Sequence, residues 1–411
     1  MSGLLAEVKD RLTFFAYLLQ LLGTLGGCKF ELARRITPAL LSCTMSDQFP
    51  NLSPAFCRSR QDKLRALLAG ESLDAAVFFN RHYVHALTGY WHGQPLTPTA
   101  VVVATSGEVT LLTHDASPSA PAADAVAAYV PNHLCTLKPV LSACLAESLN
   151  PVLAGFKTVG TDEQTPSALL SGPICRDISE KYQYLRRHKE SDEVAALEFS
   201  VRCADLTYAT AKRLLEPGIG EVEIMAEMLK VATLAAGEFL SGWGQDFQCA
   251  TPGGLARPGH TVSAGELFPL DIGVGVRGYR SDLCRTFAVD RDPTDDQAAA
   301  HARILEVMQQ GEAMLRPGQS CREMFDFVHG ELHGWKGYEF FHHAGHGIGL
   351  DAHEVPRINP GWDDTFQAGD VVAFEPGLYG KTLRAGIRLE NNYLITADGF
   401  RQLSHFPLDL V

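Results

Sequence analysis

Short apolar runs of strand length recur in the first part of the chain. Between about residues 58 and 178 they alternate with helix-like stretches, and one such run covers residues 75–79. Ala100–Ala104 and Val109–Thr113 flank the pair Ser106-Gly107, which is typical of a hairpin turn. This pattern predicts one α/β domain of about 120 residues.

A helical period replaces this pattern at Ser191. From Val194 to Leu215, apolar residues recur at alternating steps of three and four, which places them on one face of a helix. We expect Ser191 to be the N-cap, with acidic residues in the first turn, and we expect Pro217-Gly218 to end the helix.

The sequence at this helix end is repeated one hundred residues later. Leu215-Glu-Pro-Gly218 is matched by Leu315-Arg-Pro-Gly318, and Glu223 is matched by Glu323. Two helix–Pro-Gly–helix units, each followed by strand-like runs, predict a duplicated α/β half and a pseudo-twofold domain. We therefore expect an N-terminal extension over residues 1–54, a smaller α/β domain over 55–184 and a larger domain over 185–411.

Charge and cysteine usage narrow the class of protein. The 48 acidic residues outnumber the 35 basic ones by 13, which argues against nucleic-acid binding because that needs clustered Lys and Arg. Ten cysteines without a C-x-x-C pair argue against a zinc ribbon or a disulfide scaffold and predict reduced residues of a cytoplasmic protein. The apolar run at 12–25 is too short to span a membrane, so we expect no stable membrane insertion. We interpret it as part of a mis-assigned start or a loose extension, with an exported or lipid-anchored protein as the alternative.

Two aspartates are the first candidates for chemistry. Asp271 ends an apolar run, and Asp282 follows eleven residues later. The glycines Gly273, Gly275 and Gly278 allow a tight turn between them, so the two carboxylates can face each other across a hairpin. The same glycines spell the dinucleotide fingerprint G-x-G-x-x-G, but the run that follows is strand-like, and a pyrophosphate site needs a helix there.

A cluster of histidines follows. His342, His343, His346 and His353 lie within twelve residues and are interleaved with glycines. A solvated helix face does not explain this pattern, which favours a metal or acid–base site.

Two glutamates, Glu375 and Glu390, each interrupt an apolar strand. A charge there is costly unless it is paired or coordinated, and one of the two could instead form a buried salt bridge with Arg388 or Arg384. A set of four carboxylates and one imidazole suits two divalent ions, whereas Ca²⁺ rarely recruits histidine. The candidate metal ligands are Asp271, Asp282, His346, Glu375 and Glu390.

The elements D-x₁₀-D, G-H-G-I-G, E-P-G and R-x-E, in this order, resemble those of the pita-bread metallopeptidases, family M24. This family includes methionine aminopeptidase, aminopeptidase P, Xaa-Pro dipeptidase (prolidase) and creatinase. The resemblance covers residues 185–411, and the preceding domain resembles the creatinase/prolidase-type N-terminal domain in size and strand pattern. It implies an α/β (α+β) pita-bread fold whose halves are related by pseudo-symmetry, as the repeated sequence predicts.

The resemblance also implies roles for the candidate ligands. Asp271 would chelate one divalent ion, His346 and Glu375 would chelate the other, and Asp282 and Glu390 would bridge them. A metal-bridging hydroxide would attack the scissile carbonyl, and Glu375 would move the proton. Mn²⁺ is the first choice of metal, and Co²⁺, Fe²⁺ and Zn²⁺ suit the same ligands.

Further residues match family positions around these ligands. His353 would steady the tetrahedral intermediate, His342 would line the proline-side pocket, and Arg388 would orient the bridging carboxylate. The pocket wall would include His342, His353 and aromatic residues, with Tyr379, Phe340 and Phe341 as candidates.

The chain departs from the family at one position. Many members carry a histidine about seventeen residues before the first aspartate, where this chain has Gly254. His260 lies eleven residues before Asp271, and the sequence leaves open whether it reaches substrate.

The resemblance implies an Xaa-Pro peptidase, a homodimer acting on short proline-containing peptides. A preceding domain of this size argues against a methionine aminopeptidase, and a complete ligand set argues against a creatinase-like hydrolase or a non-catalytic pita-bread binding module. Xaa-Pro dipeptidase and Xaa-Pro aminopeptidase stay open, because the loops that admit longer substrates cannot be placed. Hydrolysis of another small amide and an aminopeptidase of other specificity are the alternatives.

Overall fold

The computed structural model of the chain describes residues 48–411, except 116, 119–121, 132–140 and 291. The apolar run at 12–25 and most of the predicted N-terminal extension lie outside the described residues. Within the described part, no helix combines the length and the apolar character that crossing a membrane requires.

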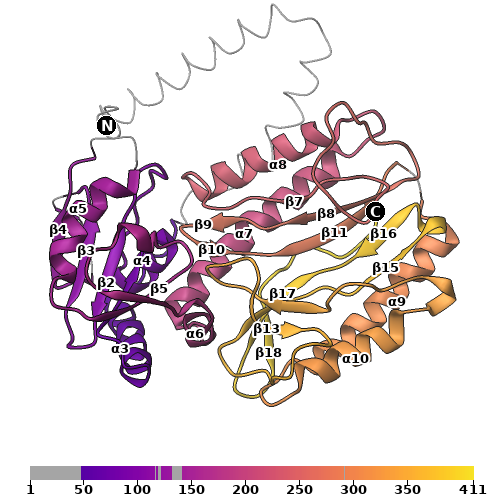
Figure 1. Cartoon of the computed structure of the whole chain (residues 1–411). Helices are drawn as coiled ribbons and strands as arrows, with labels where there is room; N and C mark the ends of the chain where they lie inside the picture. The colour runs from indigo at the N-terminus through magenta and orange to yellow at the C-terminus, as the bar shows by residue number, and fades with distance from the viewer. Residues whose placement is uncertain (1–47, 116, 119–121, 132–140, 291) are drawn as a thin grey trace, which may run out of the picture. The chain divides into compact units, whose positions relative to one another are not determined.

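Residues 54–185 build a mixed six-stranded sheet with helices packed against it (Figure 1). In spatial order the strands are β4 (Ala125–Ala128), β3 (Val109–Thr113), β2 (Ala100–Ala104), β1 (Ala75–Phe78), β5 (Thr158–Thr161) and β6 (Ile174–Asp177). The helices are α3 (Pro54–Gly70), α4 (Arg81–Thr88), α5 (Leu141–Leu153) and α6 (Ser179–Leu185). The predicted strand at 75–79 is confirmed as β1, and β2 and β3 form the predicted antiparallel hairpin.

The predicted long helix is α7 (Ser191–Leu214), and it packs against α8 (Glu221–Ala236). Its apolar stripe is confirmed, since Val194, Leu197 and Tyr208 are buried. The predicted N-cap is wrong by one residue: Glu190 is the N-cap, and its backbone N–H donates to the Glu193 carboxylate over 3.0 Å. The helix begins here because the Glu193 carboxylate accepts the hydrogen bond of the Glu190 N–H, which has no partner within the helix.

The second half repeats this arrangement with α9 (Asp295–Glu312) and α10 (Cys321–Leu332). After the first helix of each pair, a glycine with positive φ turns the chain, Gly218 at 92° and Gly318 at 84°. Gly218 N–H donates to Val262 O over 2.9 Å, and Gly318 N–H donates to Phe366 O over 2.8 Å. Isolated bridges follow at matching places, Gly220 with Thr261 and Ser320 with Thr365. The predicted duplication is therefore present in backbone hydrogen bonding as well as in sequence.

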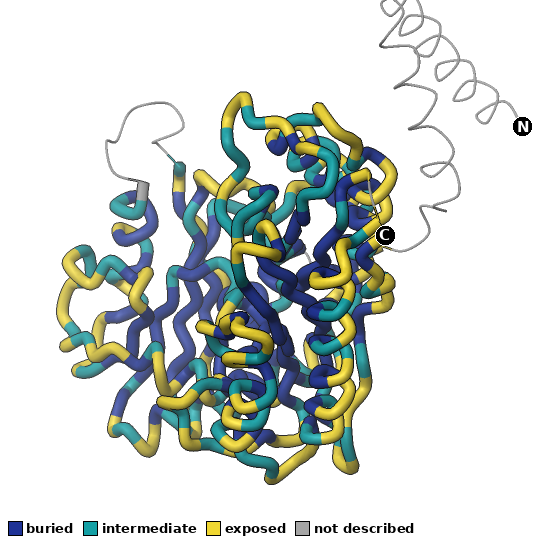
Figure 2. The backbone as a smooth tube through the Cα atoms, turned by 90° about the vertical axis from the view of Figure 1, so that its right-hand side faces the viewer, coloured by how far each residue is buried: buried dark blue, intermediate teal, exposed yellow. Residues whose placement is uncertain are grey.

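Small antiparallel sheets join the helix pairs and carry the candidate site. The first consists of β11 (Leu283–Ala288), β8 (Leu267–Ile272) and β7 (Gln245–Asp246), and the hairpin β9 (Gly275–Val276) and β10 (Tyr279–Arg280) lies between β8 and β11 in sequence. The second consists of β13 (Glu354–Ile358), β12 (Gly345–Gly347), β14 (Val371–Phe374), β17 (Asn391–Ile395) and β18 (Phe400–Gln402), with β15 (Gly377–Gly380) and β16 (Ala385–Arg388) as a further pair. Figure 2 shows buried residues concentrated in the strands and exposed residues in the outer helices and loops.

Candidate metal and peptidase site

The two candidate aspartates approach each other because β8 and β11 pair antiparallel. Asp271 lies in β8 opposite Cys284, and Asp282 immediately precedes β11. The β9–β10 hairpin connects them, as the glycine spacing predicts. Oxygen atoms of both carboxylates lie within 4.8 Å of one another and of an oxygen of Glu390.

His346 is placed by the two glycines that flank it in β12. A Cβ at Gly345 would lie 2.1 Å from Ala373 O, and a Cβ at Gly347 would lie 2.2 Å from Val355 O. Only glycine therefore allows β13 and β14 to pack so tightly on either side of β12. The G-H-G motif therefore places His346 on a strand enclosed by two others, and its side chain is buried.

The two glutamates lie just beyond strand ends rather than inside strands, which corrects the sequence-based expectation. Glu375 follows β14, and Glu390 lies between β16 and β17. Backbone hydrogen bonds anchor both, from Glu375 N–H to Ala344 O over 2.9 Å and from Glu390 N–H to Cys284 O over 3.1 Å. The regular strand pairing of β14 and of β16 ends just before these two residues, and their carboxylates lie in the cluster.

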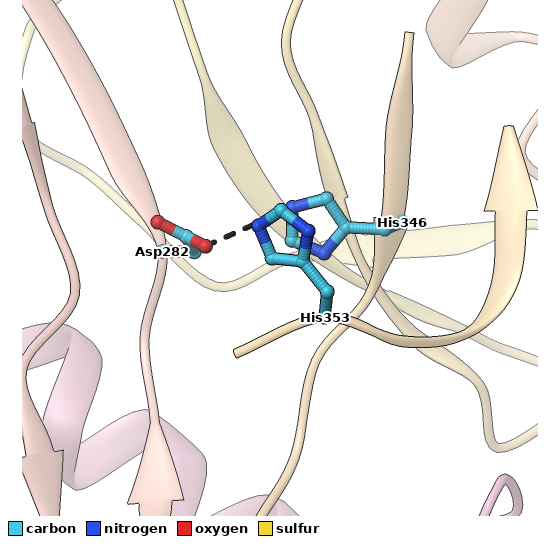
Figure 3. A group of neighbouring side chains, drawn as sticks. All are labelled: Asp282, His346 and His353. Atoms are coloured by element: carbon cyan, nitrogen blue, oxygen red, sulfur yellow. Dashed lines mark ion pairs between the residues drawn. The ribbon is translucent and has the colours of Figure 1, made fainter. Parts of the chain in front are cut away.

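All five predicted ligands meet in one cluster. Three overlapping groups of ligand atoms each lie within 4.8 Å: Asp282, His346 and His353; His346, Glu375 and Glu390; and Asp271, Asp282 and Glu390. Figure 3 shows the first group, in which the two imidazoles stack and face the Asp282 carboxylate. His353 was expected to contact substrate, and the structure also brings one of its ring nitrogens within 4.8 Å of the candidate ligand atoms of Asp282 and His346.

The donor atoms of this cluster fit cations. His346 Nδ1–H donates to Gly347 O over 3.0 Å, which leaves Nε2 as the atom that faces Asp282 Oδ2 at 3.7 Å and Glu375 Oε1 at 3.4 Å. Two ligand atoms that each lie ~2.1 Å from one tetrahedral ion are about 3.4 Å apart. In addition, Asp271 Oδ1 and Glu390 Oε2 are buried and accept no hydrogen bond from the described residues.

The electrostatics of the cluster also call for positive charge. Burial raises the pKa of Asp282 and Glu390 well above the usual range, and the neighbouring carboxylates raise each further. Burial raises the pKa of Asp271 as well, although Arg388 opposes it. Four carboxylates therefore cannot all ionise in this buried space without cations, and divalent ions would supply the missing charge.

A residue that sequence analysis missed, Asp246, completes a chain of charges beside the cluster. Arg388 Nη2 donates to Asp271 Oδ2 and to Asp246 Oδ2, both over 2.6 Å. Arg388 was expected to orient a bridging carboxylate, but the predicted ligand to which it donates is Asp271, which was expected to chelate one ion. Asp246 lies opposite Asp271 in the two-residue strand β7, which is too short to produce a recognisable sequence pattern.

A neutral histidine forms part of one wall, and a buried tyrosine supports it. His342 Nδ1–H donates to His343 O over 2.7 Å, so the Tyr379 hydroxyl donates to His342 Nε2 over 2.8 Å. Burial lowers the pKa of His342 to about 4, which keeps it neutral at pH 7. Phe341 packs against Tyr379 with ring centroids 4.6 Å apart, and it is 61% exposed. Phe340 is buried in the core instead of lining this wall.

Two further histidines touch the cluster. His343 Nδ1 lies 3.2 Å from Glu375 Oε1, a contact that sequence analysis did not single out within the histidine cluster. His353 is exposed but stacks on His346 with ring centroids 3.9 Å apart, and partial burial of its ring together with the neighbouring His346 and His343 lowers its pKa to about 4. His353 is therefore a neutral group that can donate an N–H at pH 7.

These residues line a cavity of about 310 Å³. Its lining consists of Pro252, Gly253, Asp271, Asp282, Phe341, His342, His343, His346, His353, Glu375, Arg388 and Glu390. Two predicted substrate-binding residues, His260 and Tyr379, are not part of this lining, and His260 lies 3.6 Å from Glu221 Oε1. The structure thus does not bring His260 to the cluster.

Gly254, at the departure from the family pattern, has a backbone that suits glycine. Its φ is +132°, and a Cβ would lie 2.7 Å from Gln248 Nε2. Its N–H donates to Asp246 Oδ1 over 2.7 Å. The position therefore supports Asp246 through its backbone, and a histidine side chain there would be strained.

The arrangement defines a hydrolase site built for divalent metal ions and a small substrate. Residues 195–397 match the family model of metallopeptidase family M24. The Xaa-Pro dipeptidase of Pyrococcus horikoshii is 26% identical over 271 residues, which cover 63% of this chain and 76% of that protein. The chain belongs to metallopeptidase family M24 and is a metal-dependent peptidase.

Solved structures agree on the fold. The prolidase of Pyrococcus horikoshii superposes with a TM-score of 0.71 at 21% identity, covering 86% of this chain and 100% of that one. The X-Pro aminopeptidase of Thermotoga maritima superposes with a TM-score of 0.67 at 19% identity, covering 85% and 98%. The predicted α/β pita-bread fold is confirmed.

Proposed function

We propose that this peptidase hydrolyses Xaa-Pro bonds with two divalent metal ions. The observation that supports the proposal is the position of His342, which lines the same 310 Å³ cavity as all five predicted ligands and accepts a hydrogen bond from the buried Tyr379 hydroxyl. A peptide bond that reaches the cluster would therefore place its next residue against the imidazole of His342 and the ring of Phe341.

The metal ions would be held by Asp271, Asp282, His346, Glu375 and Glu390, with Mn²⁺ as the first choice. When bound, the ions would lower the pKa of water and polarise the scissile carbonyl. Arg388, hydrogen-bonded to Asp271, would hold that ligand in place and offset part of its charge.

The protein's own groups would handle protons and the developing negative charge. Glu375 would take the proton of the attacking water and pass it to the leaving proline nitrogen. Burial would raise the pKa of Glu375, but the imidazoles of His343 and His346 beside it outweigh burial and hold that pKa well below its usual range, so Glu375 starts as a carboxylate. Neutral His353 would donate its N–H to the oxygen of the tetrahedral intermediate.

The proline ring imposes its own requirement on the pocket. An Xaa-Pro amide has no N–H to donate, so its recognition depends on ring shape. Phe341 would supply an apolar face, and Tyr379 would support it from behind and hold His342 in one orientation.

The proposal also retains the predictions that concern the whole molecule. It divides the chain near residue 184 into a smaller α/β domain and a catalytic domain, supported by the separate six-stranded sheet at 75–177. It includes a homodimer and a cytoplasmic location, which gel filtration with light scattering and cell fractionation would test.

A metal-reconstitution assay tests the proposal. Chelator-stripped protein with restored Mn²⁺ or Co²⁺ would be offered Ala-Pro, Ala-Ala and the longer peptide Ala-Pro-Gly. We expect metal-dependent cleavage of an Ala-Pro bond and at least tenfold lower kcat/KM for Ala-Ala. Cleavage of Ala-Pro alone identifies a dipeptidase, and release of alanine from Ala-Pro-Gly identifies an aminopeptidase.

Two Asp-to-Asn variants test the predicted site, one at a candidate ligand and one as its matched control. Asp271→Asn removes a ligand charge and should abolish activity, whereas Asp363→Asn, at a side chain 84% exposed, should retain it. Binding of two metal ions without cleavage of any Xaa-Pro peptide would refute the proposed specificity. Full activity of Asp271→Asn would refute the proposed site.

A further inference from the structure

A second cavity of about 460 Å³ adjoins the metal cluster. Trp243, Asp246, Leu255, Arg280 and Asp282 are among its lining residues. Asp282 also lines the first cavity, so the two cavities meet at a predicted metal ligand. If the proline side of the substrate occupies the first cavity, the residue before the scissile bond extends into the second.

Arg280 is an unpaired cation in this second cavity. Among the described residues, its guanidinium forms no ion pair and no hydrogen bond, although the backbone N–H of Arg280 donates to Gly349 O over 2.9 Å. The two carboxylates in the lining are already engaged. Asp246 accepts hydrogen bonds from Arg388 and from Gly254 N–H, and Asp282 belongs to the ligand cluster.

The Arg280 guanidinium packs against the backbone of a glycine, Gly242. A Cβ at Gly242 would lie 2.0 Å from Arg280 Nη2, so the group rests directly on the Gly242 backbone. That backbone is fixed, because Gly275 N–H donates to Gly242 O over 2.9 Å and Ser241 N–H donates to Gly275 O over 2.8 Å. The Arg280 guanidinium therefore packs against a fixed segment of backbone beside the cluster.

Charge balance favours an anion as its partner. The four carboxylates of the cluster carry four negative charges, which two divalent ions offset, and Arg388 lies against Asp246. Within the described part of the chain, the positive charge of Arg280 therefore remains without a counterpart. Trp243 and the 76% exposed Leu255 add apolar surface that suits the methylene groups of a side chain.

We propose that Arg280 binds an acidic side chain on the residue before the scissile bond, so that the enzyme prefers Glu-Pro and Asp-Pro substrates. This inference rests on the proposed Xaa-Pro activity and names the substrate class of that site. A guanidinium matches a carboxylate with two parallel N–H donors, which a neutral amide cannot use as well.

The test compares Glu-Pro with Gln-Pro, which differ in charge and hardly in shape. For the metal-loaded wild type we expect kcat/KM to be about tenfold higher for Glu-Pro, since a hydrogen bond to a charged group contributes about 1.5 kcal/mol or more. The ratio should fall to about one in Arg280→Gln, stay above one in Arg280→Lys, and fall below one in Arg280→Glu. Arg316→Gln, at an exposed arginine on another part of the surface, should keep the wild-type ratio. Circular dichroism checks that each variant is folded.

The outcomes separate this inference from the proposed function. Cleavage of Ala-Pro, Glu-Pro and Gln-Pro with equal kcat/KM would overturn the role of Arg280 and leave the Xaa-Pro activity intact. Failure to cleave any of the three would overturn both. A third comparison, Ala-Pro against Ala-Pro-amide, distinguishes the other source of a carboxylate. If Arg280→Gln removes discrimination for the free C-terminus but leaves the Glu-to-Gln ratio unchanged, Arg280 binds the peptide end and the proposal is wrong.

Discussion

Replacing Glu354 with glutamine tests how a buried ion cluster supports the site. Glu354 is fully buried, and its carboxylate accepts hydrogen bonds from Arg186 Nη1 over 2.7 Å and from Lys189 Nζ over 2.8 Å. The backbone N–H groups of Leu350 and Asp351 also donate to it. Glu354 follows His353 directly, so this cluster ties the segment before α7 to the loop that carries a candidate catalytic histidine.

The size of the effect follows from the charges that the substitution leaves behind. Burial opposes ionisation, but Arg186 and Lys189 outweigh it and lower the pKa of Glu354 from 4.5 to about 2. That difference corresponds to about 3 kcal/mol of stability at neutral pH. Glutamine would leave the Lys189 ammonium, only 3% exposed, without a counter-charge. Breaking one side of a buried ion pair costs about 3 to 5 kcal/mol, so both arguments predict a loss of this order.

Urea unfolding followed by circular dichroism measures the loss. Glu198→Gln is the matched control, because its pair with Arg401 is exposed and should contribute less than about 1 kcal/mol. The pH dependence has a definite sign. A lowered carboxyl pKa stabilises the fold above pH 4.5, and that stability is lost as pH falls toward 2, so wild type and Glu354→Gln should converge in acid.

Two results would refute this reasoning. One is a loss below about 1 kcal/mol at pH 7, which would mean that the buried charges contribute no more than an exposed pair. The other is a wild-type advantage that persists unchanged toward pH 2. Adding Lys189→Met to Glu354→Gln should recover at least about 1 kcal/mol, because the unpaired ammonium is removed.

Three further predictions concern the metal cluster and its support. Asp246→Asn should weaken metal binding roughly 10- to 100-fold by freeing Arg388 to compete for Asp271, and unchanged affinity in calorimetric titration would contradict this. Gly254→His should lower the free energy of unfolding by about 1 to 3 kcal/mol because its φ is +132°, whereas an unchanged urea midpoint would show that the loop relaxes. Mn²⁺ at about 100 times its Kd should stabilise the protein by about 2.7 kcal/mol per site, an increment that Asp271→Asn should lack for its own site.

Local sequence patterns determined the elements of this fold to a large extent. The stripe from Val194 to Leu215 predicts α7, and the repeated Pro-Gly motif predicts the duplication seen at Gly218 and Gly318. The reason is that helix periodicity and glycine turns are set by neighbours within a few residues. The five candidate ligands were also selected from the sequence, because buried carboxylates and a glycine-flanked histidine favour a metal site, and the structure brings them together in one cluster.

Contacts between distant segments decided the remainder. Asp246 and Arg388 are 142 residues apart, and only the pairing of β7 with β8 brings Asp246 opposite Asp271. His260 lies near Asp271 in sequence but contacts Glu221 instead. Arg280 and Trp243 share a cavity because Gly242 leaves space for a guanidinium, which no local pattern reports. Sequence alone thus specifies the groups that the chemistry requires, whereas strand pairing and close packing determine which of them meet, since side-chain position depends on segments far apart in the chain.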